Sequence, residues 1–262
     1  MHFTKMHGLG NDYLYVFGEV PDDIAALSVR LSDRHFGAGA DGMIYISPSQ
    51  TADFRMRIFN ADGSEAKMCG NGIRCVGKYV YDKGYTDETH LRIETLSGIK
   101  ELELSVVGGK VKAASVQMGT ATVQQDQTIR ADGQTVTLTP VSVGNPHAVL
   151  FTDDAEHAPL ETLGAKIERC PAFPDGVNVE FVQVLSPAAL RMRVWERGSG
   201  VTMACGTGSC ASAAAAVRKG YCKSDTPIAV HLDGGTLHIT VSASGQVTMT
   251  GPAETVYEGE TV

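Results

Sequence analysis

The chain has 262 residues, enough for one large domain or two of ordinary size, and its 43% apolar and 20% charged residues are ordinary for a globular protein. The formal net charge of −8 disfavours nucleic acids and anionic membranes as partners, because both would require clustered Lys and Arg. We expect no signal peptide and no membrane span, since no apolar run approaches the roughly 18 residues that cross a bilayer. The six cysteines form no C-x-x-C pair, so we expect reduced thiols in the cytoplasm.

Strands are predicted where apolar or β-branched residues alternate with polar ones. In the first half these segments are FRMRIF (54–59), LRIETL (91–96) and KELELSVV (100–107). IRCVGKYVYDK (73–83) predicts a helix that ends at Lys83-Gly84, a basic last turn followed by a glycine stop. SCASAAAAVRK (209–219) predicts a second helix with the same ending.

The two halves of the chain repeat one another. A displacement of 136 residues relates FRMRIFN (54–60) to LRMRVWE (190–196), MCGNG (68–72) to ACGTG (204–208), Lys83-Gly84-Tyr85 to Lys219-Gly220-Tyr221, and Ser97-Gly98 to Asp233-Gly234. A displacement of 134 relates Asp41-Gly42 to Asp175-Gly176 and Gly10-Asn11 to Gly144-Asn145. Six matches in the same order indicate an internal duplication, and we predict two α+β domains of related fold.

The domain boundary falls near Gly119, which assigns residues 1–118 with Cys69 to one domain and residues 119–250 with Cys205 to the other. Related halves usually pack about a pseudo-twofold axis, so equivalent positions face one another across a cleft, where small-molecule sites tend to lie. Because Cys69 and Cys205 are equivalent under the 136-residue displacement, we predict that their thiols face one another there.

Two opposed thiols suit the inversion of an α-carbon, because one group removes a proton from one face while the other delivers a proton to the opposite face. A thiol has a reference pKa of about 8.5, which a helix N-terminus can lower. Each cysteine directly precedes a predicted helix, whose free N–H groups would also bind an α-carboxylate. A Cys-Gly-x-Gly segment can also be a buried tight turn, but its duplication favours the acid/base interpretation. Cysteines without a repeat partner are predicted to be structural: Cys75, Cys170, Cys210 and Cys222.

Several segments closely resemble the diaminopimelate epimerase family. They are KMHGLGNDY (5–13), FNADGSEAKMCGNGIRC (59–75), GNPHAV (144–149), DGVNVEFV (175–182) and ERGSGVTMACGTGSCA (196–211). Proline racemase and related isomerases share the two-half fold and Cys-Gly-x-Gly, but lack the NADGS and ERG contexts. The resemblance implies two domains, each a curved mixed β-sheet wrapped around a central helix, with residues 251–262 returning to the first domain as a strand.

The resemblance also implies a function. The family interconverts LL- and meso-diaminopimelate without pyridoxal phosphate or metal, on the route to lysine and peptidoglycan, and a homodimer is expected. Cys69 and Cys205 would be the acid/base pair, with His147 and Glu196 setting their protonation and Glu196 holding the reacting amino group. The implied substrate-binding residues are Asn11, Asn60, Gly70, Asn71, Asn145, Asn178, Glu196, Arg197, Gly206 and Thr207.

These residue types suit a double zwitterion, since Arg197 offers a planar fork to a carboxylate and Asn side chains both donate and accept. Outside the matching segments, each of these residues would have a more common explanation. The Asn residues would be turn residues, His147 would be a core residue, and Glu196-Arg197 would be a surface ion pair. One departure is Gly42, where many relatives carry Gln. A backbone contact or a water must then replace that side chain.

Three other functions compete with this interpretation. A related two-cysteine racemase or isomerase could act on another small amino or carboxylic acid. A binding module could have kept the fold, although binding alone does not need two thiols. A pyridoxal-phosphate racemase is disfavoured because no Schiff-base lysine is evident.

Overall fold

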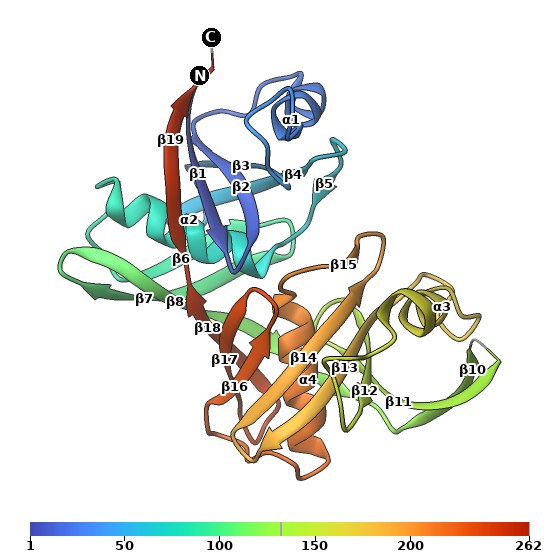
Figure 1. Cartoon of the computed structure of the whole chain (residues 1–262). Helices are drawn as coiled ribbons and strands as arrows, with labels where there is room; N and C mark the ends of the chain where they lie inside the picture. The colour runs from blue at the N-terminus through green and yellow to red at the C-terminus, as the bar shows by residue number, and fades with distance from the viewer. Residues whose placement is uncertain (132, 262) are drawn as a thin grey trace. The chain divides into compact units, whose positions relative to one another are not determined.

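The computed structural model describes residues 1–131 and 133–261. The chain forms two compact units, Met1–Val116 with Gly251–Val262, and Gln117–Thr250. Each unit combines a mixed β-sheet with one long helix (Figure 1), so the predicted α+β class is confirmed. None of the helices in the described residues is long and apolar enough to cross a membrane.

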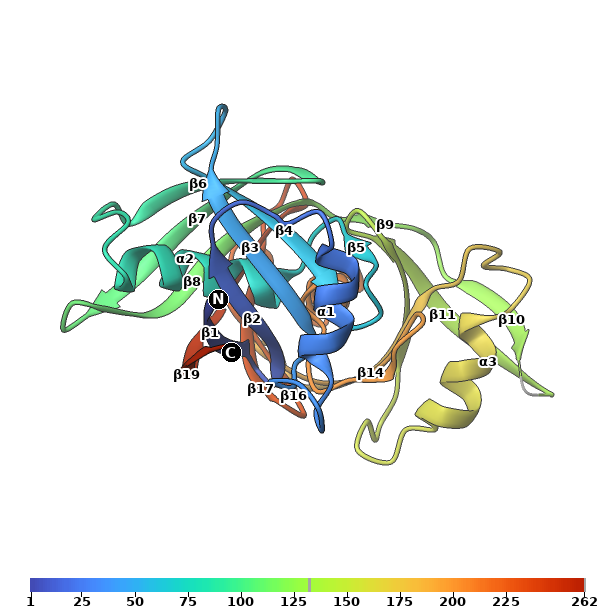
Figure 2. The ribbon, with the colours of Figure 1, turned by 90° about the horizontal axis from the view of Figure 1, so that it is seen from above.

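The sheet of the first unit is antiparallel except at two parallel pairs, β2–β3 and β4–β6. Its strands, in order across the sheet, are β19 (Glu254–Glu260), β1 (His2–Gly8), β2 (Asn11–Phe17), β3 (Gly42–Pro48), β4 (Phe54–Asn60), β6 (His90–Thr95), β7 (Gly98–Val107) and β8 (Lys110–Thr120). The short β5 (Glu65–Ala66) folds back on β4, and α1 (Ile24–Ser32) packs on β3 and β4 (Figure 2).

The sheet of the second unit has the same pattern, with parallel pairs at β12–β13 and β14–β16. Its strands, in order, are β10 (Gln127–Ala131), β11 (Gln134–Ser142), β12 (Pro146–Phe151), β13 (Asn178–Ser186), β14 (Ala189–Glu196), β16 (Ile228–Leu232), β17 (Gly235–Val241) and β18 (Gln246–Pro252). β9 (Thr122–Val123) pairs with β11, and β15 (Gly200–Val201) folds back on β14 as β5 does on β4. A π-turn, η1 (Leu160–Gly164), and α3 (Ala165–Glu168) follow β12.

The strand registers confirm the duplication but correct two of its six matches. Phe59 pairs with Met43 in the first unit and Trp195 pairs with Val179 in the second, so Gly42 corresponds to Asn178 rather than to Gly176. Likewise, Gly98 and Gly235 occupy equivalent positions in their hairpins. Gly98 therefore corresponds to Gly235, one residue beyond the predicted Gly234. The connections before β13 and β16 differ in length from their counterparts, so a constant displacement fails there.

Each central helix begins three residues earlier than its pattern predicts, at α2 (Gly70–Asp82) and α4 (Gly206–Arg218). The preceding cysteine caps the helix in both cases and thereby includes the glycines in its first turn. The predicted ends are confirmed, because Gly84 and Gly220 adopt φ values of +77° and +75° directly after the C-caps. α2 packs on β1, β2 and β7, and α4 is surrounded by strands β11 to β14, β16 and β17.

A buried ion pair fastens α2 to β8. Lys78 Nζ donates to Asp82 Oδ2 (2.7 Å) and to the carbonyl oxygen of Val111 (2.8 Å), while Asp82 Oδ1 accepts from the Val111 N–H (2.9 Å). The Lys78 and Asp82 side chains are 9% and 15% exposed. Removing one partner would therefore leave a poorly solvated charge.

We predict that Lys78→Met lowers the free energy of unfolding by about 1–3 kcal/mol, because the Asp82 carboxylate and the Val111 carbonyl lose their donor. Urea unfolding measures the change, and Lys112→Met, at an exposed position of the same strand, is the control. Equal stability of Lys78→Met and Lys112→Met would contradict a role for the pair in docking the helix.

Candidate active site

Each of the two repeated cysteines is the N-cap of a central helix. Cys69 has extended backbone angles (φ −137°, ψ 117°), and its Sγ accepts the Gly72 N–H at 3.3 Å. Cys205 has nearly the same angles (φ −118°, ψ 110°), and its Sγ accepts the Gly208 N–H at 3.3 Å. Sulfur here takes the place of the oxygen that usually caps a helix. Both sulfurs thus lie where a helix favours negative charge.

A side chain at the first-turn glycine of either helix would force a neighbouring side chain to shift. A Cβ atom at Gly72 would lie 2.7 Å from Ile44 Cδ1, and one at Gly208 would lie 2.8 Å from Glu180 Oε1 and 3.1 Å from Cys205 Sγ. Each glycine therefore lets a β3 or β13 side chain approach the capping cysteine. A side chain at Gly42 would collide with the carbonyl oxygen of Phe59, so the Gln of many relatives has no room in this backbone.

In the first unit, Asn11 is fixed against the Cys69 thiol. Cys69 Sγ lies 3.3 Å from Asn11 Oδ1, and Asn71 Nδ2 donates to the same oxygen at 3.5 Å. Asn11 Nδ2 donates to Asp41 Oδ2 at 2.8 Å, and Asp41 is paired with Arg34 (2.9 Å). Because Asp41 can only accept, it sets which end of the Asn11 amide faces the sulfur.

Two residues near Cys69 were not predicted from the sequence. Arg74 is fully buried and donates to Asn71 Oδ1 and the Gly70 carbonyl (both 3.0 Å) and to the Pro252 carbonyl (3.1 Å). Tyr13 is buried, and burial followed by the charge of an ionised Cys69 raises the pKa of its hydroxyl. A lone Arg on an apolar helix face was the only sequence signal for Arg74.

In the second unit, hydrogen bonds connect the Cys205 loop to the buried pair His147 and Glu180. Thr207 Oγ1 lies 3.7 Å from Cys205 Sγ and accepts from Asn145 Nδ2 at 3.3 Å. Asn145 Oδ1 lies 3.1 Å from His147 Nε2. His147 Nδ1 in turn lies 2.6 Å from Glu180 Oε1, a partner that the sequence did not single out.

The other predicted residues of this unit lie at the ends of β13 and β14. Glu196 Oε1 accepts from the Thr202 hydroxyl at 2.5 Å. Asn178 Oδ1 accepts the Arg197 N–H at 2.9 Å, and Arg197 Nη1 donates to the Asp175 carbonyl at 3.0 Å. Within the described part of the chain no carboxylate pairs with Arg197, so its guanidinium is not used in the surface ion pair considered from the sequence.

Asn60 corresponds to Glu196 under the repeat and occupies the matching strand end. Its Nδ2 donates to Ser64 Oγ at 3.0 Å, and its backbone N–H donates to the Ser64 carbonyl at 2.8 Å. These contacts are those of a turn residue. The structure therefore groups Asn60 with the β4–β5 hairpin rather than with the Asn11–Cys69 cluster.

The environment of Cys205 opposes ionisation. Burial, then the carboxylates of Glu196 and Glu180, raise the pKa of this thiol well above its usual value, and the Gly208 N–H and Thr207 offset only part of that. Burial and the two carboxylates thus outweigh the lowering of the Cys205 pKa that the Gly208 N–H at the helix N-terminus supplies. Burial also raises the pKa of Glu196, while Thr202 and Cys205 act in the opposite direction.

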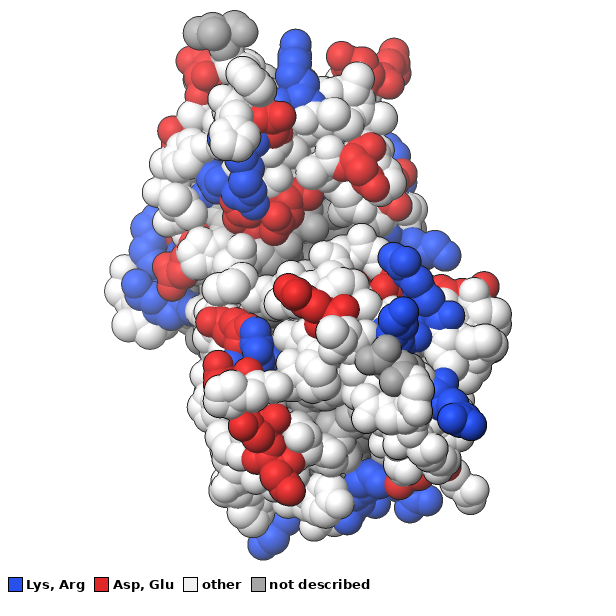
Figure 3. Space-filling model, turned by 45° about the vertical axis from the view of Figure 1, so that its right-hand side comes forward, with Lys and Arg blue, Asp and Glu red and all other residues white. Residues whose placement is uncertain are grey.

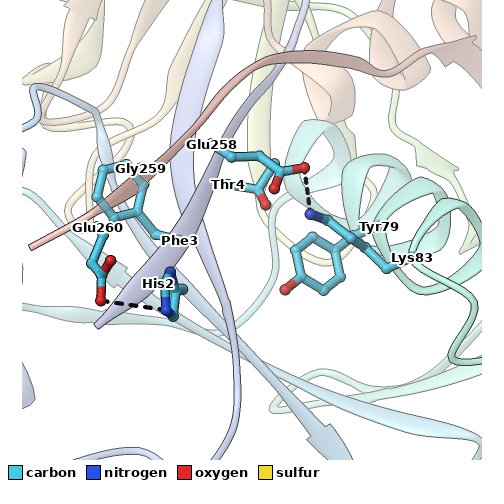
Figure 4. Close-up of a pocket in the computed structure, with 8 residues that line it drawn as sticks. All are labelled: His2, Phe3, Thr4, Tyr79, Lys83, Glu258, Gly259 and Glu260. Atoms are coloured by element: carbon cyan, nitrogen blue, oxygen red, sulfur yellow. Dashed lines mark hydrogen bonds and ion pairs between the residues drawn. The ribbon is translucent and has the colours of Figure 1, made fainter.

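A surface depression of about 320 Å³ lies elsewhere in the first unit (Figure 4). Its charged groups are already paired, Lys83 with Glu258 (2.5 Å) and His2 with Glu260 (3.3 Å). None of the predicted site residues lines it. Among the described residues, no three His, Cys, Asp or Glu side chains converge as a metal site requires.

Comparisons with known proteins identify the family of the chain. The family model described as diaminopimelate epimerase matches residues 3–124 and 139–256. The chain is 49% identical to a diaminopimelate epimerase of Acetivibrio thermocellus, with 99% of this chain and 98% of that protein covered. It is 51% identical to one of Bacillus licheniformis (98% and 97% covered) and 49% identical to one of Bacillus subtilis (98% and 97%).

Solved structures share the fold at lower sequence identity. A probable proline racemase from Agrobacterium radiobacter has a TM-score of 0.78 at 18% identity, covering 100% of this chain and 92% of that one. A hydroxyproline epimerase from Agrobacterium vitis has a TM-score of 0.75 at 18% identity, covering 99% and 91%. With a matching family model and near full-length relatives at about half identity, the chain belongs to the diaminopimelate epimerase family of isomerases.

Proposed function

We propose that this chain interconverts LL- and meso-2,6-diaminopimelate by proton transfer through Cys69 and Cys205, in the synthesis of lysine and peptidoglycan precursors. The observation that carries the proposal is the duplicated cap, in which two equivalent cysteines each place a sulfur at a helix N-terminus. The relatives at 47–51% identity that are named diaminopimelate epimerases support the choice of substrate.

In the proposed mechanism each face of the substrate α-carbon meets one of the two cysteine sulfurs. The thiolate takes the α-proton, the electron pair left on carbon delocalises into the α-carboxylate, and the opposite thiol protonates the carbon. The first-turn amides of α2 and α4, including those of Gly70, Asn71, Gly206 and Thr207, would bind the carboxylate and its developing charge. Reversal exchanges the roles of the two thiols.

Side chains around the two caps would select the substrate. Glu196, buried beside Cys205, would hold the reacting ammonium group and receive the thiol proton when needed, together with His147. The Arg197 fork would pair with a substrate carboxylate, while Asn11, Asn60, Asn71, Asn145 and Asn178 would complete the polar contacts.

The proposal includes a cytoplasmic homodimer acting on a small molecule. All six cysteines are free thiols, which suits a reducing compartment. Lys and Arg are interspersed with Asp and Glu on the face drawn in Figure 3, which favours a small zwitterion over a polyanion. Val256 and Tyr257 on β19 are 52% and 40% exposed and supply apolar surface for a second copy.

A related isomerase acting on another amino acid is the second candidate, because the structural neighbours include a probable proline racemase and a hydroxyproline epimerase. Incubating the purified protein separately with LL-diaminopimelate, L-proline and hydroxyproline, and resolving isomers by chiral chromatography, separates the two. Conversion of proline or hydroxyproline alone would replace the proposed substrate.

We predict that Cys69→Ala and Cys205→Ala each abolish epimerisation of diaminopimelate, because each removes the only acid or base on one face of the carbon. Cys222→Ala, a buried cysteine without a repeat partner, should keep most of the activity. Circular dichroism confirms that the variants are folded. A single-cysteine variant with near wild-type turnover would refute the two-thiol mechanism.

Arg197→Lys keeps the charge but loses the planar pair of donors. We expect kcat/KM for diaminopimelate to fall tenfold to a hundredfold, corresponding to about 1.5–3 kcal/mol for a charge-assisted hydrogen bond. Arg169→Lys, at an exposed position of the same unit, is the matched control. Unchanged kinetics of Arg197→Lys would remove Arg197 from the substrate site.

A further inference from the structure

Glu180 is a fully buried carboxylate for which the proposed reaction has no role. Its side chain is 0% exposed and lies 2.6 Å from His147 Nδ1 through Oε1. Its second oxygen, Oε2, has no hydrogen-bond partner among the described residues. Burying a carboxylate in this way is costly, so its position beside the site calls for a physical explanation.

The hydrogen bonds around His147 show how Glu180 is held. Asn145 Nδ2 donates to Thr207 Oγ1, which turns Asn145 Oδ1 toward His147 Nε2 (3.1 Å). Both ring nitrogens of His147 thus face oxygen atoms, and the Nδ1 contact fixes the position of Glu180 Oε1.

The Glu180 carboxylate lies near the Cys205 sulfur. A Cβ built on Gly208 would lie 2.8 Å from Glu180 Oε1 and 3.1 Å from Cys205 Sγ, so both atoms border the same small space in the first turn of α4. The first unit has a different chemistry at the equivalent positions. Ile44 replaces Glu180 and Tyr13 replaces His147, and Ile44 Cδ1 occupies the space beside Gly72.

We propose that Glu180 is a positioning residue for Cys205: held by His147, its carboxylate sets how strongly Cys205 and Glu196 bind their protons. The charged groups that face Cys205 are Glu180 from β13 and Glu196 from β14, with His147 behind Glu180 on β12. Glu180 raises the pKa of both Cys205 and Glu196, and on Glu196 its effect exceeds the opposing effect of His147. Glu180 thereby gives Cys205 electrostatic surroundings that differ from those of Cys69.

The predicted effect of Glu180 on the pH dependence of catalysis rests on the proposed function, and its direction follows from the charge that is removed. Glu180→Gln keeps the size and a hydrogen bond to His147 but removes the carboxylate. Loss of a nearby negative charge lowers the pKa of Glu196 and of Cys205, so both limbs of the kcat/KM profile should move to lower pH. A merely structural role would lower activity or stability without moving the profile.

Glu168→Gln is the matched control. Glu168 is also a buried carboxylate of the second unit, but it bonds the Trp195 Nε1–H (2.7 Å) and the Gly198 N–H (2.9 Å) instead of facing Cys205. Its replacement should leave the position of both limbs unchanged. Equal shifts in the two variants, or none in Glu180→Gln, would overturn the proposal.

A readout without substrate separates this inference from the proposed function. In protein labelled with ¹³C at cysteine Cβ, the Cys205 resonance, assigned through Cys205→Ala, reports ionisation of the thiol with pH. Its midpoint should fall in Glu180→Gln and stay in place in Glu168→Gln, whether or not diaminopimelate is turned over. A Cys205 midpoint that is the same in wild-type and Glu180→Gln protein would contradict the role of Glu180.

Discussion

The site depends on one local interaction, made twice: a cysteine sulfur accepts the N–H of the third residue after it and so caps a long buried helix. The cap combines an extended cysteine, a first-turn glycine beside which a neighbouring side chain approaches closely, and a helix whose first amides can bind an anion. Both Cys-Gly-x-Gly segments share these features. They also place the thiol proton of each cysteine at the helix N-terminus, where the helix favours negative charge.

Duplication supplies two equivalent caps, and later divergence makes them different. Cys69 lies against amides, with Asp41 setting the orientation of Asn11, whereas Cys205 lies against carboxylates that hold its proton. A pair of opposed acid and base groups needs one group protonated and the other ionised. In the proposed mechanism, unequal surroundings would distinguish the two thiols before a substrate arrives, which a perfectly symmetric pair could not do.

Much of this could be predicted from the sequence, because the features are local. Three such features each depend on only a few neighbouring residues: the strand alternation at 54–59, the Lys-Gly helix ends, and the cysteines ahead of both helices. Glu180 and Arg74 could not be predicted, since their partners His147 and Pro252 lie 33 and 178 residues away along the chain. The net direction of the Cys205 pKa could not be predicted, because burial, a tertiary property, dominates it. The predicted match of Gly42 to Gly176 was wrong because the connection before β13 differs in length from the one before β3.

The central claim, that two thiols serve opposite faces of one carbon, is tested most directly by isotope labelling during the first turnovers. LL-diaminopimelate is incubated with the enzyme in D₂O, and deuterium at the α-carbon is measured in each isomer by mass spectrometry at low conversion. The account predicts deuterium in the newly formed meso isomer and almost none in recovered LL-diaminopimelate, because the proton removed and the proton delivered reside on different groups. Equal early labelling of both isomers would show that a single base exchanges its proton with solvent on one face, and would contradict the account.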